Sequence, residues 1–213
     1  MTLSGLIRAF CTVSLASMTA IAQDTSNHFY QAIRNNDLAV LRVLLKAADA
    51  NTKDKRGTTP LMYAAAFGSI DAMNMLLAAG ADANAKNALD ASALHWCAGD
   101  LAKVRLLVSK GADVNVRSKP GRTPLIIAAA HDGASEIVRV LLNQGADVSA
   151  RDGAMVNALA AAADANDTTT VRLLLDRGAT VSAKDPSSGM ARRSAPSVPS
   201  GAGSAEWSNR SGP

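Results

Sequence analysis

Aromatic residues make up only 3% of this 213-residue chain, and cysteine occurs just twice. Hydrophobic residues nevertheless account for 48%, and much of that share is alanine. So few bulky side chains argue against a core of large interlocking residues and favour closely packed helices. The composition is too apolar for general disorder, and its apolar stretches are too interrupted for a protein with several membrane spans.

The chain also lacks the motifs of common chemical sites. The cysteines, Cys11 and Cys97, form no CxxC pair or Cys/His cluster, and the histidines show no HExxH spacing. No G-x-S-x-G turn, phosphate-binding loop or cluster of metal-type carboxylates is present. The sequence therefore predicts no enzyme activity, no catalytic residue, no cofactor and no bound metal.

The positive charge of the chain lies mostly at its ends. Of a net charge of +4, residues 1–22 contribute +1 and the residues from Pro186 onward contribute +2, so residues 23–185 carry only +1. The row of basic residues in the repeated turn segments is short and has no interleaved aromatic residues, unlike a surface that binds single-stranded nucleic acid. We therefore expect no nucleic acid among the partners.

The first 22 residues have the pattern of a secretory signal peptide. Arg8 precedes an uncharged, mostly apolar segment that ends in Ala20-Ile21-Ala22, an A-x-A cleavage pattern. The apolar part is too short to span a bilayer, and no lipid-attachment pattern closes it. We expect a periplasmic or secreted mature protein without a stable membrane anchor, beginning near Gln23. The alternative is an irregular amphipathic start of a cytosolic protein.

A period of about 33 residues runs through the chain. Four Leu-Leu segments are followed by Gly80, Gly111, Gly145 and Gly178, at spacings of 31, 34 and 33 residues. A second cluster follows each of the first three glycines after twelve residues, and it also occurs one period earlier. Its copies are Thr59-Pro60-Leu61-Met62, Ser92-Ala93-Leu94-His95, Thr123-Pro124-Leu125-Ile126 and Asn157-Ala158-Leu159-Ala160.

Each part of the period has a structural interpretation. Thr, Ser or Asn can cap a helix whose first turn tolerates Pro, and Gly after the Leu-Leu pair can end a second helix in the left-handed conformation. Each period therefore predicts a turn, a short helix, a tight connection and a longer helix. One such unit cannot bury its own apolar face, whereas a stack of them can.

These motifs resemble the ankyrin repeat. The T-P-L-H-x-A hallmark is best kept in residues 59–64 and 123–128, and G-A-D-V-N appears in full at residues 111–115. The resemblance covers about Asn27 to Asp185. It implies an all-α solenoid of helix-turn-helix units with β-turn fingers, which acts as a protein-binding scaffold.

The units expected from this resemblance are not all alike. The first has no hallmark and has Ala47 in place of the terminating glycine, as an N-terminal cap would. The second full unit lacks two residues near Ala98–Asp100, the third has one extra near His131–Gly133, and Asp90 replaces a turn glycine. The expected boundaries are a signal peptide at 1–22, a capping unit at 23–57, repeats at 58–90, 91–121, 122–155 and 156–185, and a disordered tail at 186–213.

The abrupt end of the repeat array has two possible interpretations. Residues 186–213 are either a natural flexible tail or the sign of a truncated array, since a further hallmark would be due near Met190. A related alternative is that the chain is the interaction or targeting module of a larger secreted enzyme whose catalytic part is absent.

Several polar residues are expected to be structural. The resemblance implies that His95 bonds a neighbouring turn, and Cys97, at a small inward helix position, is expected to be buried and inert. Asp82, Asp113 and Asp147 recur because the turn recurs, and they do not form an acid–base set.

The resemblance also implies where a partner docks, namely on the turn tips and inner helices. Eight bases outnumber three acids on the finger segments, so the acids should lie chiefly in helices and their ends. We expect a monomer with a mildly basic row of fingertips that favours an acidic partner surface; the alternative is an ordinary solvated rim. The candidate partner-binding residues are Lys55, Arg56, Thr58, Phe67, Leu89, Lys119, Arg122 and His131.

Overall fold

The computed structural model describes residues 15–180, all of which belong to one compact unit. Residues 1–14 of the predicted signal peptide, the last residues of the final repeat and the predicted tail at 186–213 lie outside the described residues. The described part contains ten helices and one isolated antiparallel bridge between Arg151 and Asn157. The helices are α2 (Leu15–Arg34), α3 (Leu38–Ala47), α4 (Pro60–Phe67), α5 (Ile70–Ala78), α6 (Ala93–Trp96), α7 (Leu101–Ser109), α8 (Pro124–Ala129), α9 (Ser135–Asn143), α10 (Ala158–Asp164) and α11 (Thr168–Asp176).

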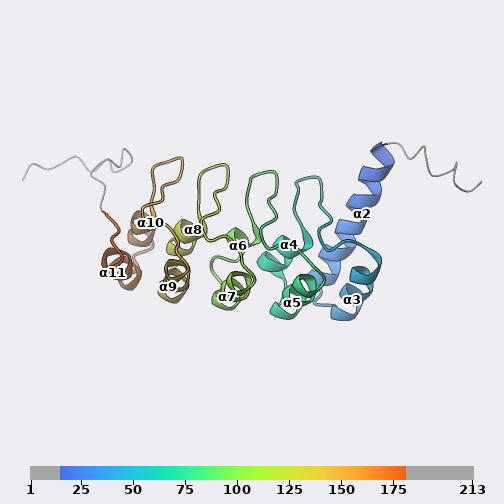
Figure 1. Cartoon of the computed structure of the whole chain (residues 1–213), viewed down its shortest axis with the longest axis horizontal. Coiled ribbons are helices and arrows are strands. Elements are labelled where there is room, and N and C mark those ends of the chain that lie inside the picture. Colours follow the sequence, from blue (N-terminus) through green and yellow to red (C-terminus); the bar gives the residue numbers. More distant parts are fainter. Residues whose placement is uncertain (1–14, 181–213) are drawn as a thin grey trace, which may run out of the picture. The chain divides into compact units, whose positions relative to one another are not determined.

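The helices stack in two rows beneath a row of projecting fingers (Figure 1). The inner row consists of α2, α4, α6, α8 and α10, each packed against the next. The outer row consists of α3, α5, α7, α9 and α11, and each of these helices follows its inner partner in the chain. This arrangement confirms the expected all-α repeat solenoid.

The predicted caps begin and end the helices. Thr59 and Thr123 each accept a hydrogen bond from a main-chain amide three residues on, at 3.3 Å, and Asn157 does so at 2.9 Å. The glycines that end the outer helices have φ between +79° and +87°, a region that favours residues without a Cβ atom. After α3, where no such glycine exists, Ala48 is extended instead.

Hydrogen bonds inside and between the fingers keep them in register. In the first finger, Asp54 Oδ1 accepts from the amides of Arg56 and Thr58, both at 2.8 Å. Neighbouring fingers are joined by a main-chain bond of 2.8 Å at each step. These bonds run from the amides of Ala88, Lys119 and Gly153 to the carbonyls of Arg56, Leu89 and Pro120.

The left-handed position of the fingers holds different residues. Gly57 and Gly121 have φ of +73° and +78°, and Asp90, at +56°, tolerates this conformation as expected. Met155 takes the same place in the last finger, with φ of +64°, which the sequence did not lead us to expect. Because methionine has no short polar side chain to bond locally, this finger is strained by about 1–2 kcal/mol.

The altered unit lengths lie between the paired helices, as predicted. From the start of the inner helix to the start of the outer helix there are 10, 8, 11 and 10 residues in the four full repeats. The shortened repeat has an inner helix, α6, of only four residues. The lengthened repeat places Gly133, with φ of +71°, in its connection.

An asparagine ladder links the ends of successive outer helices. The Asn51 side chain donates to the Gly80 carbonyl at 3.0 Å and accepts from the Asp82 amide at 2.7 Å. Asn84 and Asn115 repeat both bonds one and two repeats later. The next position holds Ser149, whose hydroxyl instead donates to the Asp147 carboxylate at 2.6 Å.

Extending the ladder is expected to stabilise the last repeat. Ser149→Asn places an amide where it can reach the Gly178 carbonyl and the Thr180 amide, and should raise the free energy of unfolding by about 1 kcal/mol. Urea unfolding measures the gain, and hydrogen exchange of the Thr180 amide locates it. Ser149→Ala, which has no amide, serves as the control. An unchanged urea midpoint in Ser149→Asn would contradict a stabilising role for the asparagine ladder at this position.

Candidate protein-binding surface

Four aromatic residues meet in a hollow between the first two fingers and the inner helices. We call this the aromatic hollow; it has a volume of about 670 Å³. Only seven aromatic residues exist in the whole chain, so more than half of them are here. The residues that line the hollow are Tyr30, Asp54, Arg56, Thr58, Tyr63, Phe67, Asn87, Ala88, Leu89 and Trp96.

The repeat brings these aromatic side chains together. Tyr30, Tyr63 and Trp96 are spaced by 33 residues, so they occupy the same position of three successive inner helices. The rings of Tyr30 and Tyr63 stack with centroids 4.3 Å apart and planes 15° apart. Phe67 follows one turn later in α4, with its ring 5.0 Å from that of Tyr63.

The rings are held by polar contacts at their edges. The Tyr30 hydroxyl donates to the Thr58 carbonyl at 2.9 Å, and burial together with the nearby Asp54 carboxylate raises the pKa of Tyr30 well above its usual value. Arg34 lies over the Tyr63 ring, 5.9 Å from its centroid, and its Nε donates to the Tyr63 hydroxyl at 3.0 Å. The aromatic surface is thus preorganised.

A second hollow of about 490 Å³ lies further along the same row of inner helices. Its polar edge includes Arg122, whose Nε is 3.6 Å from the buried carboxylate of Asp152, and His131, whose Nδ1 donates to the Ile127 carbonyl at 2.9 Å. Ile127 and Ala161 take the places here that Tyr63 and Trp96 take in the aromatic hollow. This hollow is therefore smaller and more polar.

The two hollows include six of the eight candidate residues. Arg56, Thr58, Phe67 and Leu89 line the aromatic hollow, and Arg122 and His131 line the second. Lys55 and Lys119 are exposed on the fingers and line neither. Their roles in binding stay predictions. Tyr30, Tyr63 and Trp96 were missed, although their 33-residue spacing was a signal that could have found them.

The sequence matches the family described as "Ankyrin repeats (3 copies)" over residues 13–87, 29–118 and 94–185. The chain belongs to the ankyrin-repeat family. Ankyrin repeats are a protein–protein interaction module, and domains of this kind are generally non-catalytic. Both the two-row stack of helices and the finger geometry fit this assignment.

Curated relatives contain similar ankyrin arrays within much longer proteins. Ankyrin repeat and KH domain-containing protein mask-1 of Caenorhabditis elegans is 38% identical over 128 residues, which cover 56% of this chain and 5% of that protein. The mouse B-cell lymphoma 3 protein homolog is 39% identical over 93 residues, covering 42% and 21%. The neurogenic locus Notch protein of Drosophila melanogaster is 40% identical over 105 residues, covering 46% and 4%. The chain thus spans at most about a fifth of these relatives.

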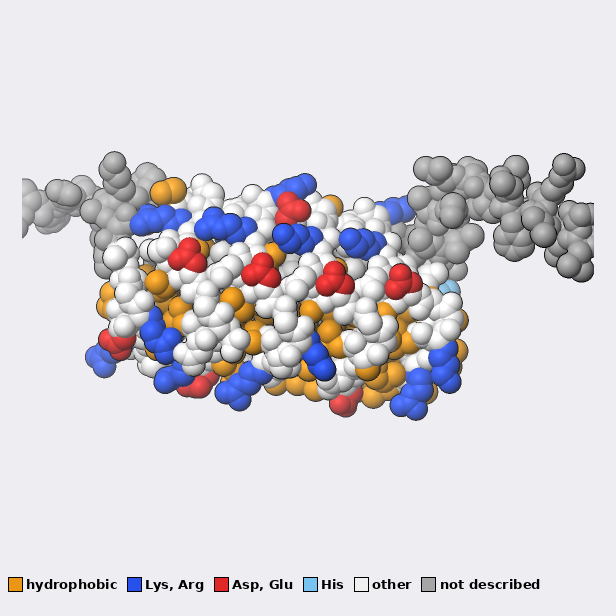
Figure 2. All heavy atoms as spheres, viewed as in Figure 1, with side chains coloured by type: hydrophobic (Ala, Val, Ile, Leu, Met, Phe, Trp, Pro, Cys, Tyr) orange, Lys and Arg blue, Asp and Glu red, His pale blue; other side chains and the backbone are white. Residues whose placement is uncertain are grey.

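Charges on the ankyrin fingers form two parallel rows. Bases recur at Lys53, Lys86, Arg117 and Arg151, and exposed aspartates recur with the same spacing at Asp49, Asp82, Asp113 and Asp147. Figure 2 shows basic side chains along the fingers and acidic side chains directly beneath them. The aspartates follow the helix ends, as expected, but they offset the bases on this face. The predicted basic character of the fingertips therefore depends on the remaining bases of the fingers, which do not belong to this row.

His95 and Cys97 have the structural roles predicted for them. His95 Nε2 donates to the Arg122 carbonyl at 3.0 Å, while Nδ1 accepts from the Ser92 amide at 3.2 Å. Cys97 is only 3% exposed, and burial raises the pKa of its thiol to about 12. In the described part of the chain, no three His, Cys, Asp or Glu side chains are placed to hold a metal ion. No helix there is long and apolar enough to span a membrane.

The buried His95 makes the array sensitive to acid. Burial lowers the pKa of His95 below its ordinary value of 6.5, so the unfolded chain binds a proton more readily than the folded one. Stability should therefore be constant above about pH 7 and fall as the pH drops through 6.5 toward the folded pKa. Urea unfolding at pH 7.5 and 5.5 measures this fall. His95→Gln, which cannot titrate, should lose less stability between these two pH values. An equal loss in this variant would mean that other groups cause the acid sensitivity.

Proposed function

We propose that this chain is an exported, non-enzymatic scaffold that binds a partner protein through its fingers and inner helices. The observation that carries the proposal is the aromatic hollow. Phe67 and Leu89 are 63% and 60% exposed and lie beside Trp96, in a chain that otherwise has few aromatic side chains. Clustered exposed aromatic and aliphatic residues are typical of the centre of a protein interface.

Export is compatible with how α2 joins the array. Cleavage after Ala22 would retain in the mature chain the buried residues of α2 that belong to the hydrophobic core, namely Phe29, Ala32 and Ile33. The test is the mass and N-terminal sequence of the protein recovered from the exported fraction. We expect a chain beginning at Gln23; a chain that retains Met1 and stays in the cytosol would contradict export.

Affinity capture tests the binding function. The protein is immobilised as the wild type, as Phe67→Ser with Leu89→Ser, and as Val43→Ser, a control whose residue is equally exposed on the outer helix α3. We expect the wild type and the control to retain a protein that the double variant loses. Equal retention by all three would contradict a binding role for the aromatic hollow.

A further inference from the structure

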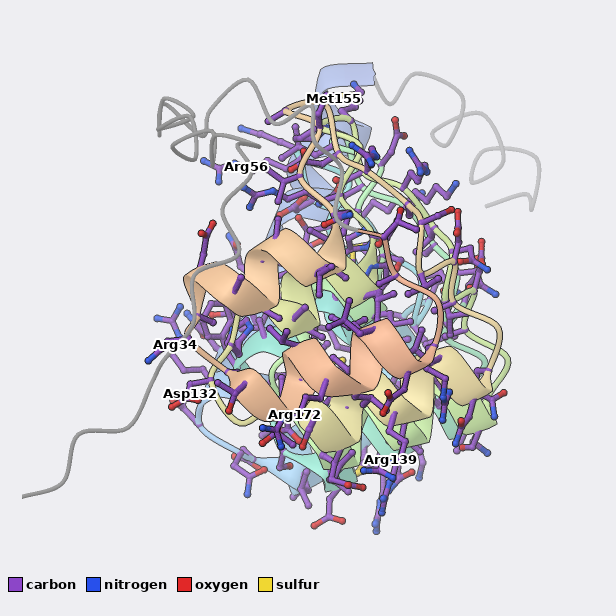
Figure 3. All side chains as sticks on the ribbon, turned by 90° about the vertical axis from the view of Figure 1, so that its left-hand side faces the viewer. Arg34, Arg56, Asp132, Arg139, Met155 and Arg172 are labelled. Carbon is purple, nitrogen blue, oxygen red and sulfur yellow. The ribbon has the colours of Figure 1, made fainter. Side chains whose placement is uncertain are left out.

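Cations flank the aromatic hollow on two sides. Arg56 is exposed on the first finger, and Arg34 is exposed at the end of α2, where it lies over the Tyr63 ring. Figure 3 shows both guanidinium groups on the same side of the molecule, Arg56 above at the fingers and Arg34 below at the helices. A ligand seated on the aromatic rings therefore lies between two positive charges.

The acidic group of the hollow is already engaged. Among the described residues that line it, the only carboxylate is Asp54. Its Oδ1 accepts two main-chain hydrogen bonds within the finger, and the carboxylate lies near the Tyr30 hydroxyl. A carboxylate that accepts hydrogen bonds keeps its charge, so Arg34, Arg56 and Asp54 together present a net charge of +1, two positive charges minus one.

The positive charge beside the aromatic hollow argues against the binding of methylated amines, a known function of aromatic clusters. Cages that bind methylated amines need free ring faces and no competing cation. Here Tyr30 and Tyr63 stack on each other, and the Arg34 guanidinium is a competing cation that donates to the Tyr63 hydroxyl. A cationic ligand would be repelled, whereas a carboxylate beside the rings would be attracted.

We propose that the aromatic hollow binds a peptide segment of a partner protein in which a large apolar side chain stands beside acidic residues. The apolar side chain packs against Phe67, Leu89 and Trp96, and the carboxylates pair with Arg34 and Arg56. This inference rests on the proposed function and narrows the partner to one chemical class. The second hollow does not share the pattern, because Arg122 there is paired with Asp152.

Selection from a random peptide display library tests the proposal with the full chain as bait. The baits are the wild type, Arg34→Glu with Arg56→Glu, Arg56→Glu alone, and the control Arg105→Glu with Arg172→Glu, whose residues are exposed on the outer helices. Circular dichroism melts confirm that each bait is folded. Arg56→Glu alone keeps Arg34 in place, so it tests the effect of charge even if loss of Arg34 disturbs the Tyr63 ring.

The wild type and the control should enrich peptides with Asp or Glu within two residues of Leu, Phe or Trp. Synthetic copies should bind the double variant about tenfold more weakly and Arg56→Glu a few-fold more weakly, and high salt should weaken binding to the wild type. Neutral or basic peptides, or equal binding by the charge-reversed baits, would overturn the inference. If no peptide is enriched while protein capture succeeds, the partner presents a folded surface; the inference then fails and the proposed function stands.

Discussion

Replacement of Leu94 by alanine is expected to lower the free energy of unfolding by about 2–5 kcal/mol and to split unfolding into two steps. Leu94 is fully buried in α6, the four-residue helix that packs between α4 and α8 in the middle of the inner row. Because each repeat contacts only its neighbours, a weak central repeat uncouples the two ends of the array. Urea unfolding followed by circular dichroism measures both effects.

Leu159→Ala is the matched control, because it removes the same side chain from the equivalent position of α10 in the last described repeat. Leu159 is also buried, but α10 has a repeat on one side only among the described residues. This change should fray one end of the array and preserve a single main transition. A single transition in both variants, with equal loss of stability, would contradict the coupling through α6.

Replacement of Phe67 by alanine is expected to weaken binding of the captured partner about 30-fold, the effect of losing about 2 kcal/mol at an interface hot spot. The thermal midpoint should change little, because Phe67 is mostly exposed and its main described ring contact is to Tyr63. Isothermal titration calorimetry with the purified partner measures the affinity. Val43→Ala should leave it unchanged, and a Phe67→Ala variant of normal affinity would place the partner elsewhere.

Much of the scaffold could be predicted from the sequence because its determinants are local. A threonine before a proline caps a helix, and a glycine after a Leu-Leu pair ends one, whatever lies in the neighbouring repeats. The role of His95 is not local and was implied by the resemblance to the ankyrin repeat, in which its partner, here the Arg122 carbonyl, occupies a fixed place in the next finger. Changes of length between paired helices were visible as breaks in the period.

The aromatic hollow depends on residues that are distant in sequence, so it was harder to predict. Tyr30 lies in the capping unit, which carries no hallmark, so its 33-residue spacing from Tyr63 was a weak signal, and the packing of α2 on α4 brings the two rings together. The pairing of Arg122 with Asp152 joins two fingers and offsets the charge of that one basic candidate, which the order of residues alone does not indicate. The left-handed conformation of Met155 was not expected, because methionine is not a residue type that favours positive φ.

Site-specific photo-crosslinking in the native exported fraction tests the proposed binding surface most directly. A photoreactive phenylalanine analogue is placed either at Phe67, in the aromatic hollow, or at Val43, which is 65% exposed on the outer row. We predict one discrete protein adduct from position 67 and none from position 43. No adduct at position 67, or the same adducts from both positions, would contradict a partner site in the aromatic hollow.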